Sequence, residues 1–194
     1  QVGKKKMHSN SQEKTEINSL PKNDSLLKSE KYLTRLTSLN KQILLKHLNW
    51  CKTARTKQIT PKGDWNVWLI LAGRGWGKTR TGAQDIAFYG LTRPNSRIAI
   101  VTPTFGDGRD TCIEGVSGLL GCIEPDLIEN WNRSIGELTL KNGTIYKTFS
   151  SEQPDRLRGP QFHRAWCDEL GSWKNEEAWD QLLFGLRLGE KPQV

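Results

Sequence analysis

The most informative stretch of this sequence is Trp65-Asn-Val-Trp-Leu-Ile-Leu-Ala-Gly-Arg-Gly-Trp-Gly-Lys-Thr79. Residues 67–71 form an unbroken apolar run, which predicts a buried parallel strand covered on both faces. Three glycines follow the run, and the stretch from Thr79 to Tyr89 has a helical pattern. A strand, a glycine-rich turn and a helix in this order predict a loop that binds phosphate through backbone N–H groups and the helix N-terminus.

The turn is close to the phosphate-binding pattern G-x-x-x-x-G-K-[ST], with Ala72 at the first glycine position. This departure matters only if position 72 needs a positive φ. Lys78 is expected to reach the β- and γ-phosphates of ATP, and the Thr79 hydroxyl is expected to ligate Mg²⁺. A glycine-rich turn that binds nothing is the alternative, whereas a kinase-type loop is excluded because Lys78 replaces its third glycine. The residues predicted to contact the nucleotide in this loop are Ala72, Gly73, Arg74, Gly75, Trp76, Gly77, Lys78, Thr79 and Arg80.

A second apolar stretch, Phe162-His-Arg-Ala-Trp-Cys-Asp-Glu169, ends in two carboxylates. This pattern predicts a buried strand that reaches the phosphate end of the sheet. Asp168 is expected to hold Mg²⁺ directly or through water, and Glu169 to polarise the water that attacks the γ-phosphate. A capping or surface role is the alternative for such a pair, but its position roughly 90 residues after the phosphate loop favours the catalytic interpretation.

Arginine and glutamine side chains add candidates for the same chemistry. A guanidinium offers bidentate donors that keep their charge as phosphoryl transfer proceeds. Arg74 lies inside the loop. Arg156 and Arg158 lie in a polar segment before the predicted strand that ends in the two carboxylates. Gln58 precedes the loop strand, where its amide could donate to and accept from the edge of adenine. Simple solvation is the alternative for Gln58 and for the two later arginines.

The remaining pattern predicts an α/β architecture with parallel crossovers. Gly90 is expected to end the first helix. The other predicted elements are a strand over 97–102, a helix over 110–120, and a hairpin of 137–140 with 144–149 around Asn142-Gly143.

The positive charge is concentrated at the N-terminus. The net charge of the chain is +8, but residues 1–62 hold 14 Lys/Arg against 4 Asp/Glu, while residues 63–194 hold 15 against 17. A basic arm of this kind suits contact with nucleic-acid phosphates, and a solvated tail is the alternative. The four cysteines match no zinc pattern, which favours a reducing, cytoplasmic setting, and no apolar run is long enough to cross a membrane.

Composition and periodicity divide the chain into three parts. Residues 1–24 are polar and are expected to be disordered. Residues 25–62 combine one long or two short amphipathic helices, ending at Trp50, with a connector that contains Gln58. Residues 63–194 are expected to form the nucleotide-binding domain.

Several stretches in fixed order resemble the ATPase half of the large terminase subunit of tailed phages. They are Ala54-Arg-Thr-Lys-Gln58, Trp68 to Ala83, Asn142-Gly143, Ser150 to Gln161 and Ala165 to Leu170. The resemblance covers roughly residues 50–190. In combination these motifs are specific, whereas the phosphate loop alone would not be.

The resemblance implies a P-loop NTPase fold of the ASCE type, with a central, mostly parallel sheet flanked by helices. It implies a motor that hydrolyses Mg-ATP to move double-stranded DNA into a procapsid, working as a homo-oligomer with the phage portal and the small terminase subunit. It assigns Gln58 to adenine, makes Ala72 acceptable, and gives Arg74 a role in hydrolysis. Arg158 matches a candidate finger offered to a neighbouring subunit, with Arg156 the weaker choice.

The family also has a threonine-rich coupling segment after the Asp-Glu pair, and then a nuclease domain. This sequence ends at Val194, about where that next strand is expected, so the domain is expected to be incomplete and the nuclease domain absent. A fragment, a split gene product and a decayed prophage remnant fit this pattern. A catalytically silent nucleotide- or DNA-binding remnant is therefore the main functional alternative, and a helicase-like ATPase is a weaker one.

Overall fold

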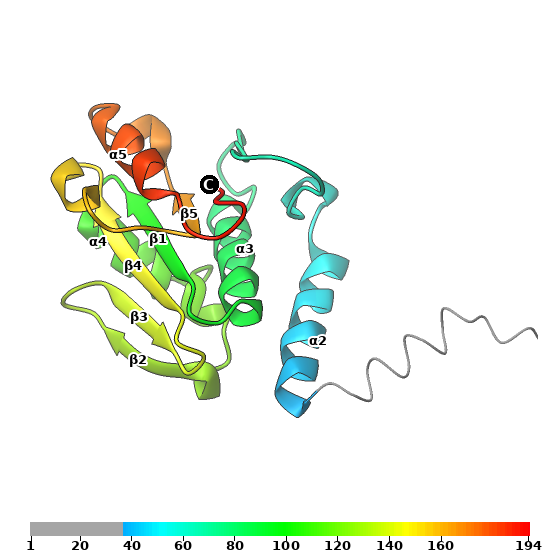
Figure 1. The fold of residues 1–194 in the computed structure, drawn as a ribbon. Coiled ribbons are helices and arrows are strands. Elements are labelled where there is room, and N and C mark those ends of the chain that lie inside the picture. The colour runs from blue at the N-terminus through cyan, green and yellow to red at the C-terminus, as the bar shows by residue number, and fades with distance from the viewer. Residues whose placement is uncertain (1–36) are drawn as a thin grey trace, which may run out of the picture. The chain divides into compact units, whose positions relative to one another are not determined.

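The computed structural model describes residues 37–194 (Figure 1). The chain divides into two units, residues 1–42 and residues 43–194, and the larger unit contains all the strands described. The predicted tail over 1–24 and the start of the predicted helical region lie outside the described residues. Helix α2, Ser38–Thr53, continues three residues beyond the predicted end at Trp50.

A mixed five-stranded sheet in the order β2-β3-β4-β1-β5 forms the centre of the larger unit. The central strand β1 runs parallel to both β4 and β5, so that Ile100 is paired with Thr148 on one side and Trp166 on the other. The predicted α/β class with central parallel strands is confirmed. The strands are β1 Arg97–Thr102, β2 Ile128–Asn132, β3 Glu137–Leu140, β4 Ile145–Ser150 and β5 Arg164–Cys167.

The predicted hairpin around Asn142-Gly143 is also confirmed, since β3 and β4 pair antiparallel. Gly143 adopts φ +82°, a conformation that favours glycine. The Asn142 side chain donates a hydrogen bond of 2.8 Å to the Gly90 carbonyl, which joins the hairpin to helix α3. Strand β2 was not predicted, and it pairs antiparallel with β3 at the edge of the sheet.

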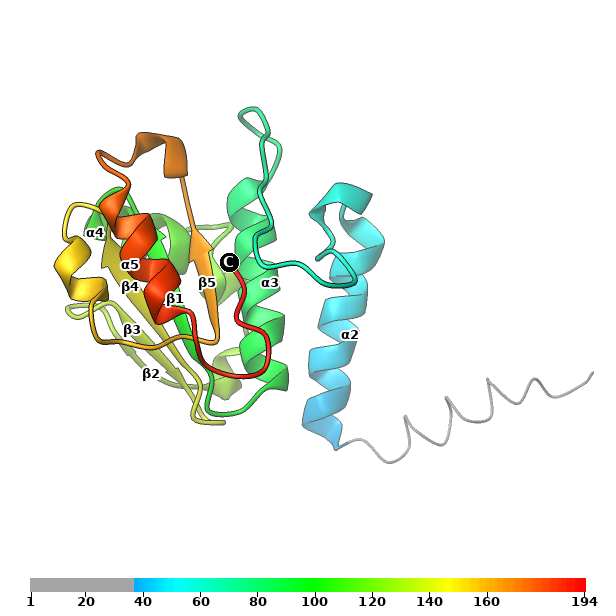
Figure 2. The same ribbon diagram turned by 45° about the horizontal axis from the view of Figure 1, so that its top comes forward.

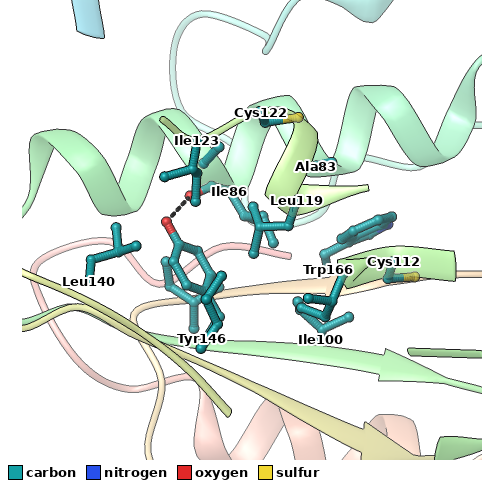
Figure 3. Close-up of a cluster of buried hydrophobic side chains, with 14 of the residues drawn as sticks. Ala83, Ile86, Ile100, Cys112, Leu119, Cys122, Ile123, Leu140, Tyr146 and Trp166 are labelled. Carbon is teal, nitrogen blue, oxygen red and sulfur yellow. Dashed lines mark hydrogen bonds between the residues drawn. The ribbon is translucent and has the colours of Figure 1, made fainter. Parts of the chain in front are cut away.

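Helices cover both faces of the sheet (Figures 1 and 2). Successive side chains of a strand point to opposite faces, and β1 follows this rule. Its residues Ile98 and Ile100 belong to one buried cluster with α3 (Lys78–Thr92). Figure 3 shows Ile100 in this cluster. Its residues Ala99 and Val101 belong to a second cluster with α5 (Glu177–Gly185), a helix that the sequence analysis did not predict.

Gly90 does not end α3, contrary to prediction. The helix continues to Thr92, and Gly90 is buried inside it. A Cβ at this position would lie 2.2 Å from the hydroxyl oxygen of Tyr146, so only glycine permits the observed approach. The Tyr146 hydroxyl donates to the Ile86 carbonyl at 3.2 Å (Figure 3). Gly90 therefore serves packing between α3 and β4.

The helix predicted over 110–120 is replaced by shorter turns. The short helix α4 (Phe105–Asp107) leads into a π-helical turn, Gly108–Ile113. A separate 3₁₀ turn, Leu119–Gly121, follows. Gly115 and Gly118 lie between these two turns and interrupt the helix. The Gly118 N–H donates to the Gly115 carbonyl at 2.7 Å.

The predicted strand over 67–71 is wrong, although this segment does lead into the phosphate loop. The segment belongs to no strand, and Val67, Leu69 and Leu71 are 50%, 62% and 86% exposed. Its backbone pairs only near its start: Trp68 N–H donates to the Val194 carbonyl, and Val194 N–H to the Asn66 carbonyl. A cavity of about 560 Å³, lined by both residues 67–72 and β5, lies between them. An apolar run forms a buried strand only with neighbours on both sides, and residues 37–194 provide none beyond Trp68.

Among the helices of residues 37–194, none combines the length and the apolar character that crossing a bilayer requires.

Candidate functional site

The glycine-rich loop connects residues 67–71 to the N-terminus of α3. Gly75 and Gly77 have φ values of +75° and +91°, in the left-handed region. Gly73 and Gly75 have no heavy atom within 4 Å of the position a Cβ would take, so the loop borders open space. Helix α3 begins at Lys78, immediately after the last glycine. The first N–H groups of a helix lack intrahelical partners and attract anions, so the loop can receive a phosphate chain. Ala72 does not have a positive φ, and this removes the objection to alanine there.

Lys78 joins the loop to the end of β5. Its Nζ donates to the Ala72 carbonyl at 3.2 Å and lies 3.9 Å from Glu169 Oε1. The structure thus brings together two motifs that are far apart in the sequence, as predicted from their patterns. When a phosphate binds, Lys78 can leave the Ala72 carbonyl and the Glu169 carboxylate and bind the phosphate oxygens instead.

Asp168 and Glu169 follow β5 directly but have different environments. Asp168 is 8% exposed, and its backbone N–H donates to the Val101 carbonyl at 2.9 Å. Burial raises the pKa of the Asp168 carboxyl above its ordinary value, and the nearby negative charge of Glu169 acts in the same direction. A hydrogen bond from the Cys112 thiol and the charge of Lys78 oppose this rise. A bound cation would favour the ionised form of this carboxyl.

Glu169 adopts a left-handed backbone, with φ +45° and ψ +47°. A residue other than glycine in this region carries strain of about 1–3 kcal/mol, and such strain is found mainly at functional sites. The turn separates the two carboxylates, because Asp168 is buried while the Glu169 side chain is 59% exposed. The Asp168 carboxylate is therefore held in the interior, and the Glu169 carboxylate reaches solvent water.

Gln58 is buried, and its amide bonds to the loop. Its Nε2 donates to the Trp76 carbonyl at 3.1 Å and to the Thr81 hydroxyl at 3.2 Å, while its Oε1 accepts from the Arg55 N–H at 3.0 Å. Arg55 also donates to the Trp76 carbonyl, at 2.8 Å. Sequence reasoning missed Arg55 and Thr81 as supports of the loop. The signal for both was their position, three residues before Gln58 and three after Lys78.

The predicted arginines lie apart from one another. Arg74 is exposed on the loop, and Arg80 lies beside the side-chain amide of Gln84 on α3, 3.0 Å from it. Arg158 pairs with Glu177 of α5 at 2.9 Å and with Asp155 at 3.2 Å. Among the described residues, Arg158 has its ion pairs with these two carboxylates and none with the loop.

The donor set fits Mg²⁺. Thr79 and Asp168 supply a hydroxyl and a carboxylate, the hard oxygen ligands that this ion prefers. Residues 37–194 contain no group of three or more His, Cys, Asp or Glu residues that could hold a metal. Mg²⁺ bound with a nucleotide needs no such group, because water and phosphate oxygens complete its six ligands.

A buried ion pair under the site was also missed by sequence reasoning. Arg164 of β5 bonds both oxygens of Asp85 on α3, each at 2.8 Å. The Gln193 side chain bonds the same guanidinium, and the Thr60 hydroxyl donates to Asp85 at 2.7 Å. The pair ties the helix that starts at Lys78 to the strand that Asp168 follows. Nothing in the sequence marks one partner for the other.

Residues 69–194 match the family described as terminase large subunit, T4likevirus-type, N-terminal. No curated protein sequence matches this chain.

Two solved structures are similar to the chain. The large terminase ATPase domain of Thermus phage P74-26 has 19% sequence identity, with 61% of this chain and 53% of that chain covered and a TM-score of 0.46. An arginine-to-alanine mutant of the same domain has 18% identity, with 61% and 54% covered and a TM-score of 0.46. The chain spans about half the length of these solved domains. Since the family match extends over residues 69–194, the chain belongs to the terminase large subunits of the T4likevirus type, through their N-terminal part.

Proposed function

We propose that this chain binds Mg-ATP and hydrolyses it as the ATPase module of a motor that packages double-stranded DNA. The proposal is carried by one observation: Lys78, at the start of α3, lies between the loop carbonyl of Ala72 and the carboxylate of Glu169, next to buried Asp168. A phosphate-binding loop and two carboxylates of different burial therefore meet at one place.

The loop and Lys78 bind the phosphate chain. Backbone N–H groups from Gly73 to Gly77 and the N-terminus of α3 face the phosphates, and Lys78 leaves Ala72 and Glu169 for the β- and γ-oxygens. Thr79 and Asp168 would hold Mg²⁺, which would supply positive charge against the charge that develops on the phosphate oxygens. Arg74, exposed on the same loop, is placed to add a second positive charge at this point.

Glu169 orients the attacking water. Its exposure gives water access to the carboxylate, and the binding of Lys78 to phosphate releases the glutamate from its present contact. Nucleotide binding thus frees the Glu169 carboxylate from Lys78, so that the carboxylate can bind the attacking water.

Gln58 and Arg158 have further proposed roles. Gln58 Oε1 accepts one hydrogen bond and has a second lone pair that can accept from the adenine amino group. Gln58 would then link the base to the Trp76 carbonyl. Arg158 serves a neighbouring subunit of a homo-oligomer, because its exposed guanidinium pairs only with surface carboxylates among the described residues. DNA, the portal and the small terminase subunit are the proposed partners of this assembly.

Phosphate release from Mg-ATP tests the proposal, measured with and without double-stranded DNA. We expect turnover that requires Mg²⁺ and is abolished in both Lys78→Ala and Glu169→Gln. Lys174→Ala is the matched control, because Lys174 is a surface lysine paired with Glu152. Turnover that survives Lys78→Ala and Glu169→Gln would refute the proposal.

A silent nucleotide-binding chain is the second candidate, and one observation favours it. The segment that carries the loop is not part of the sheet, and Val67, Leu69 and Leu71 are exposed. A loop supported by polar bonds alone can bind ATP without holding it in a reactive geometry. Calorimetric ATP binding without phosphate release, with DNA present, would support this candidate.

A further inference from the structure

Cys112 lies on an unusual turn at the carboxyl end of the sheet. The π-helical turn Gly108–Ile113 contacts β1 and β4, and Glu114 N–H bonds the Arg109 carbonyl five residues earlier at 2.9 Å. Such turns are rare in proteins, and those that occur are often found at functional sites. A Cβ at Gly108 would lie 2.1 Å from Thr148 Cγ2, so glycine allows the turn to approach the sheet. The turn thereby brings Cys112 to the end of β5.

The thiol of Cys112 contacts the carboxylate that is proposed to hold magnesium. Its Sγ lies 3.6 Å from Asp168 Oδ2, and both residues are buried, with exposures of 0% and 8%. A carboxylate next to a thiol accepts, so the S–H donates. Within residues 37–194, Cys112 is the one side-chain hydrogen-bond donor to the Asp168 carboxylate, whereas the Trp173 indole N–H donates to the Asp168 backbone carbonyl at 3.1 Å. Figure 3 shows Cys112 beside Trp166, at the end of the buried cluster.

We propose that Cys112 is a positioning residue of the magnesium site. Its thiol holds Asp168 Oδ2 and thereby fixes the rotation of the carboxylate, which leaves Oδ1 for the cation or for a cation-bound water. Outer hydrogen-bond partners of this kind orient metal ligands and change metal affinity when they are removed. The inference rests on the proposed function, because it requires that Asp168 serve Mg²⁺.

Packing is the competing explanation, since buried cysteines behave as small apolar side chains. Cys122 provides the comparison within this chain. It is buried in the same cluster, at 2% exposure, but its thiol bonds the Gly118 carbonyl at 3.3 Å. The two thiols have the same volume and similar burial, and only Cys112 contacts Asp168.

The test uses the full chain and the variants Cys112→Ala, Cys112→Ser and Cys122→Ala. Mn²⁺, a paramagnetic substitute for Mg²⁺, is titrated by electron paramagnetic resonance in the presence of a non-hydrolysable ATP analogue. Nucleotide affinity in EDTA and thermal unfolding are measured on the same samples. We expect Cys112→Ala to weaken Mn²⁺ binding about threefold to tenfold, the low end of the range for lost outer partners because a thiol is a weak donor.

We expect nucleotide affinity in EDTA to stay unchanged in every variant, and Cys122→Ala to bind Mn²⁺ as the wild type does. Cys112→Ser retains a donor on a shorter bond, so its affinity should lie between those of the wild type and Cys112→Ala. Equal Mn²⁺ affinity in Cys112→Ala and wild type, or an equal loss in Cys122→Ala, would overturn the inference alone. A wild-type chain that binds no nucleotide would overturn the proposed function and this inference with it.

Discussion

The two sides of the candidate site are built differently. Asp168 follows β5, a strand paired with β1 and joined to α3 through the buried Arg164–Asp85 ion pair. The loop follows residues 66–72. These residues are largely exposed, and their hydrogen bonds to other backbone groups lie only near Trp68. Polar contacts hold the loop itself, chiefly those of Gln58 with the Trp76 carbonyl and Thr81.

The difference separates stability from binding. Side chains buried between sheet and helices determine the free energy of unfolding of the β5 side. The hydrogen bonds of the loop side contribute less to that free energy but set the geometry that a phosphate meets. Substitutions on the two sides should therefore affect different measurements.

The largest effect is expected for Asp85→Ala. This change leaves the Arg164 guanidinium, which is 5% exposed, without its carboxylate, and an unpaired buried charge lowers the free energy of unfolding by about 3–5 kcal/mol. Urea denaturation measures this loss. Glu177→Ala is the control, because it removes an exposed ion pair with Arg158 and should cost about 0–1 kcal/mol. Equal losses of unfolding free energy in Asp85→Ala and Glu177→Ala would contradict the distinction between buried and exposed contacts.

Leu182→Ala is expected to have the next largest effect. Leu182 is 0% exposed on α5 and packs against the face of β1 that carries Ala99 and Val101. Its truncation should lower the free energy of unfolding by about 2–5 kcal/mol. Leu71→Ala, at a side chain that is 86% exposed, should change the same quantity by less than about 0.5 kcal/mol. A large effect of Leu71→Ala in urea denaturation would show that residues 67–71 are buried in solution.

A smaller effect on stability but a clear effect on binding is expected for Gln58→Ala. The change leaves the Arg55 N–H without its acceptor and removes the Gln58 donor to the Thr81 hydroxyl oxygen, a loss of about 1–3 kcal/mol confined to the loop. Nucleotide affinity, measured by calorimetry, should fall about tenfold or more, since about 1.4 kcal/mol corresponds to a factor of ten. Gln153→Ala changes an exposed glutamine and should leave affinity as it is. An unchanged affinity in Gln58→Ala would mean that these bonds do not shape the site.

The elements with strong local patterns could be predicted from the sequence. The apolar run of β1, the Asn142-Gly143 hairpin and the start of α3 after Gly77 each follow from nearby residues. The convergence of Lys78 on the Asp168-Glu169 pair also followed from the motifs, because both were expected at the phosphate end of one sheet.

The failures have a common physical cause, which is dependence on distant residues. Val67 to Leu71 has the composition of a buried strand, but strand formation depends on neighbours that a local pattern cannot supply. Glycine is typical of a helix end, and the packing role of Gly90 depends on its contact with Tyr146, which is distant in the sequence. The Cys112–Asp168 contact and the Arg164–Asp85 pair join residues 56 and 79 positions apart, and no spacing rule indicates either one.

Calorimetric titration of Mg-ATP into the wild-type chain, Lys78→Ala and Lys174→Ala, under the same conditions, decides whether Lys78 belongs to a nucleotide site. We expect wild type and Lys174→Ala to bind with equal affinity, and Lys78→Ala to lose binding at least tenfold while its unfolding midpoint in urea stays within error of wild type. Equal affinity of Lys78→Ala and wild type would contradict the claim that the loop and the Asp168-Glu169 pair form one nucleotide site.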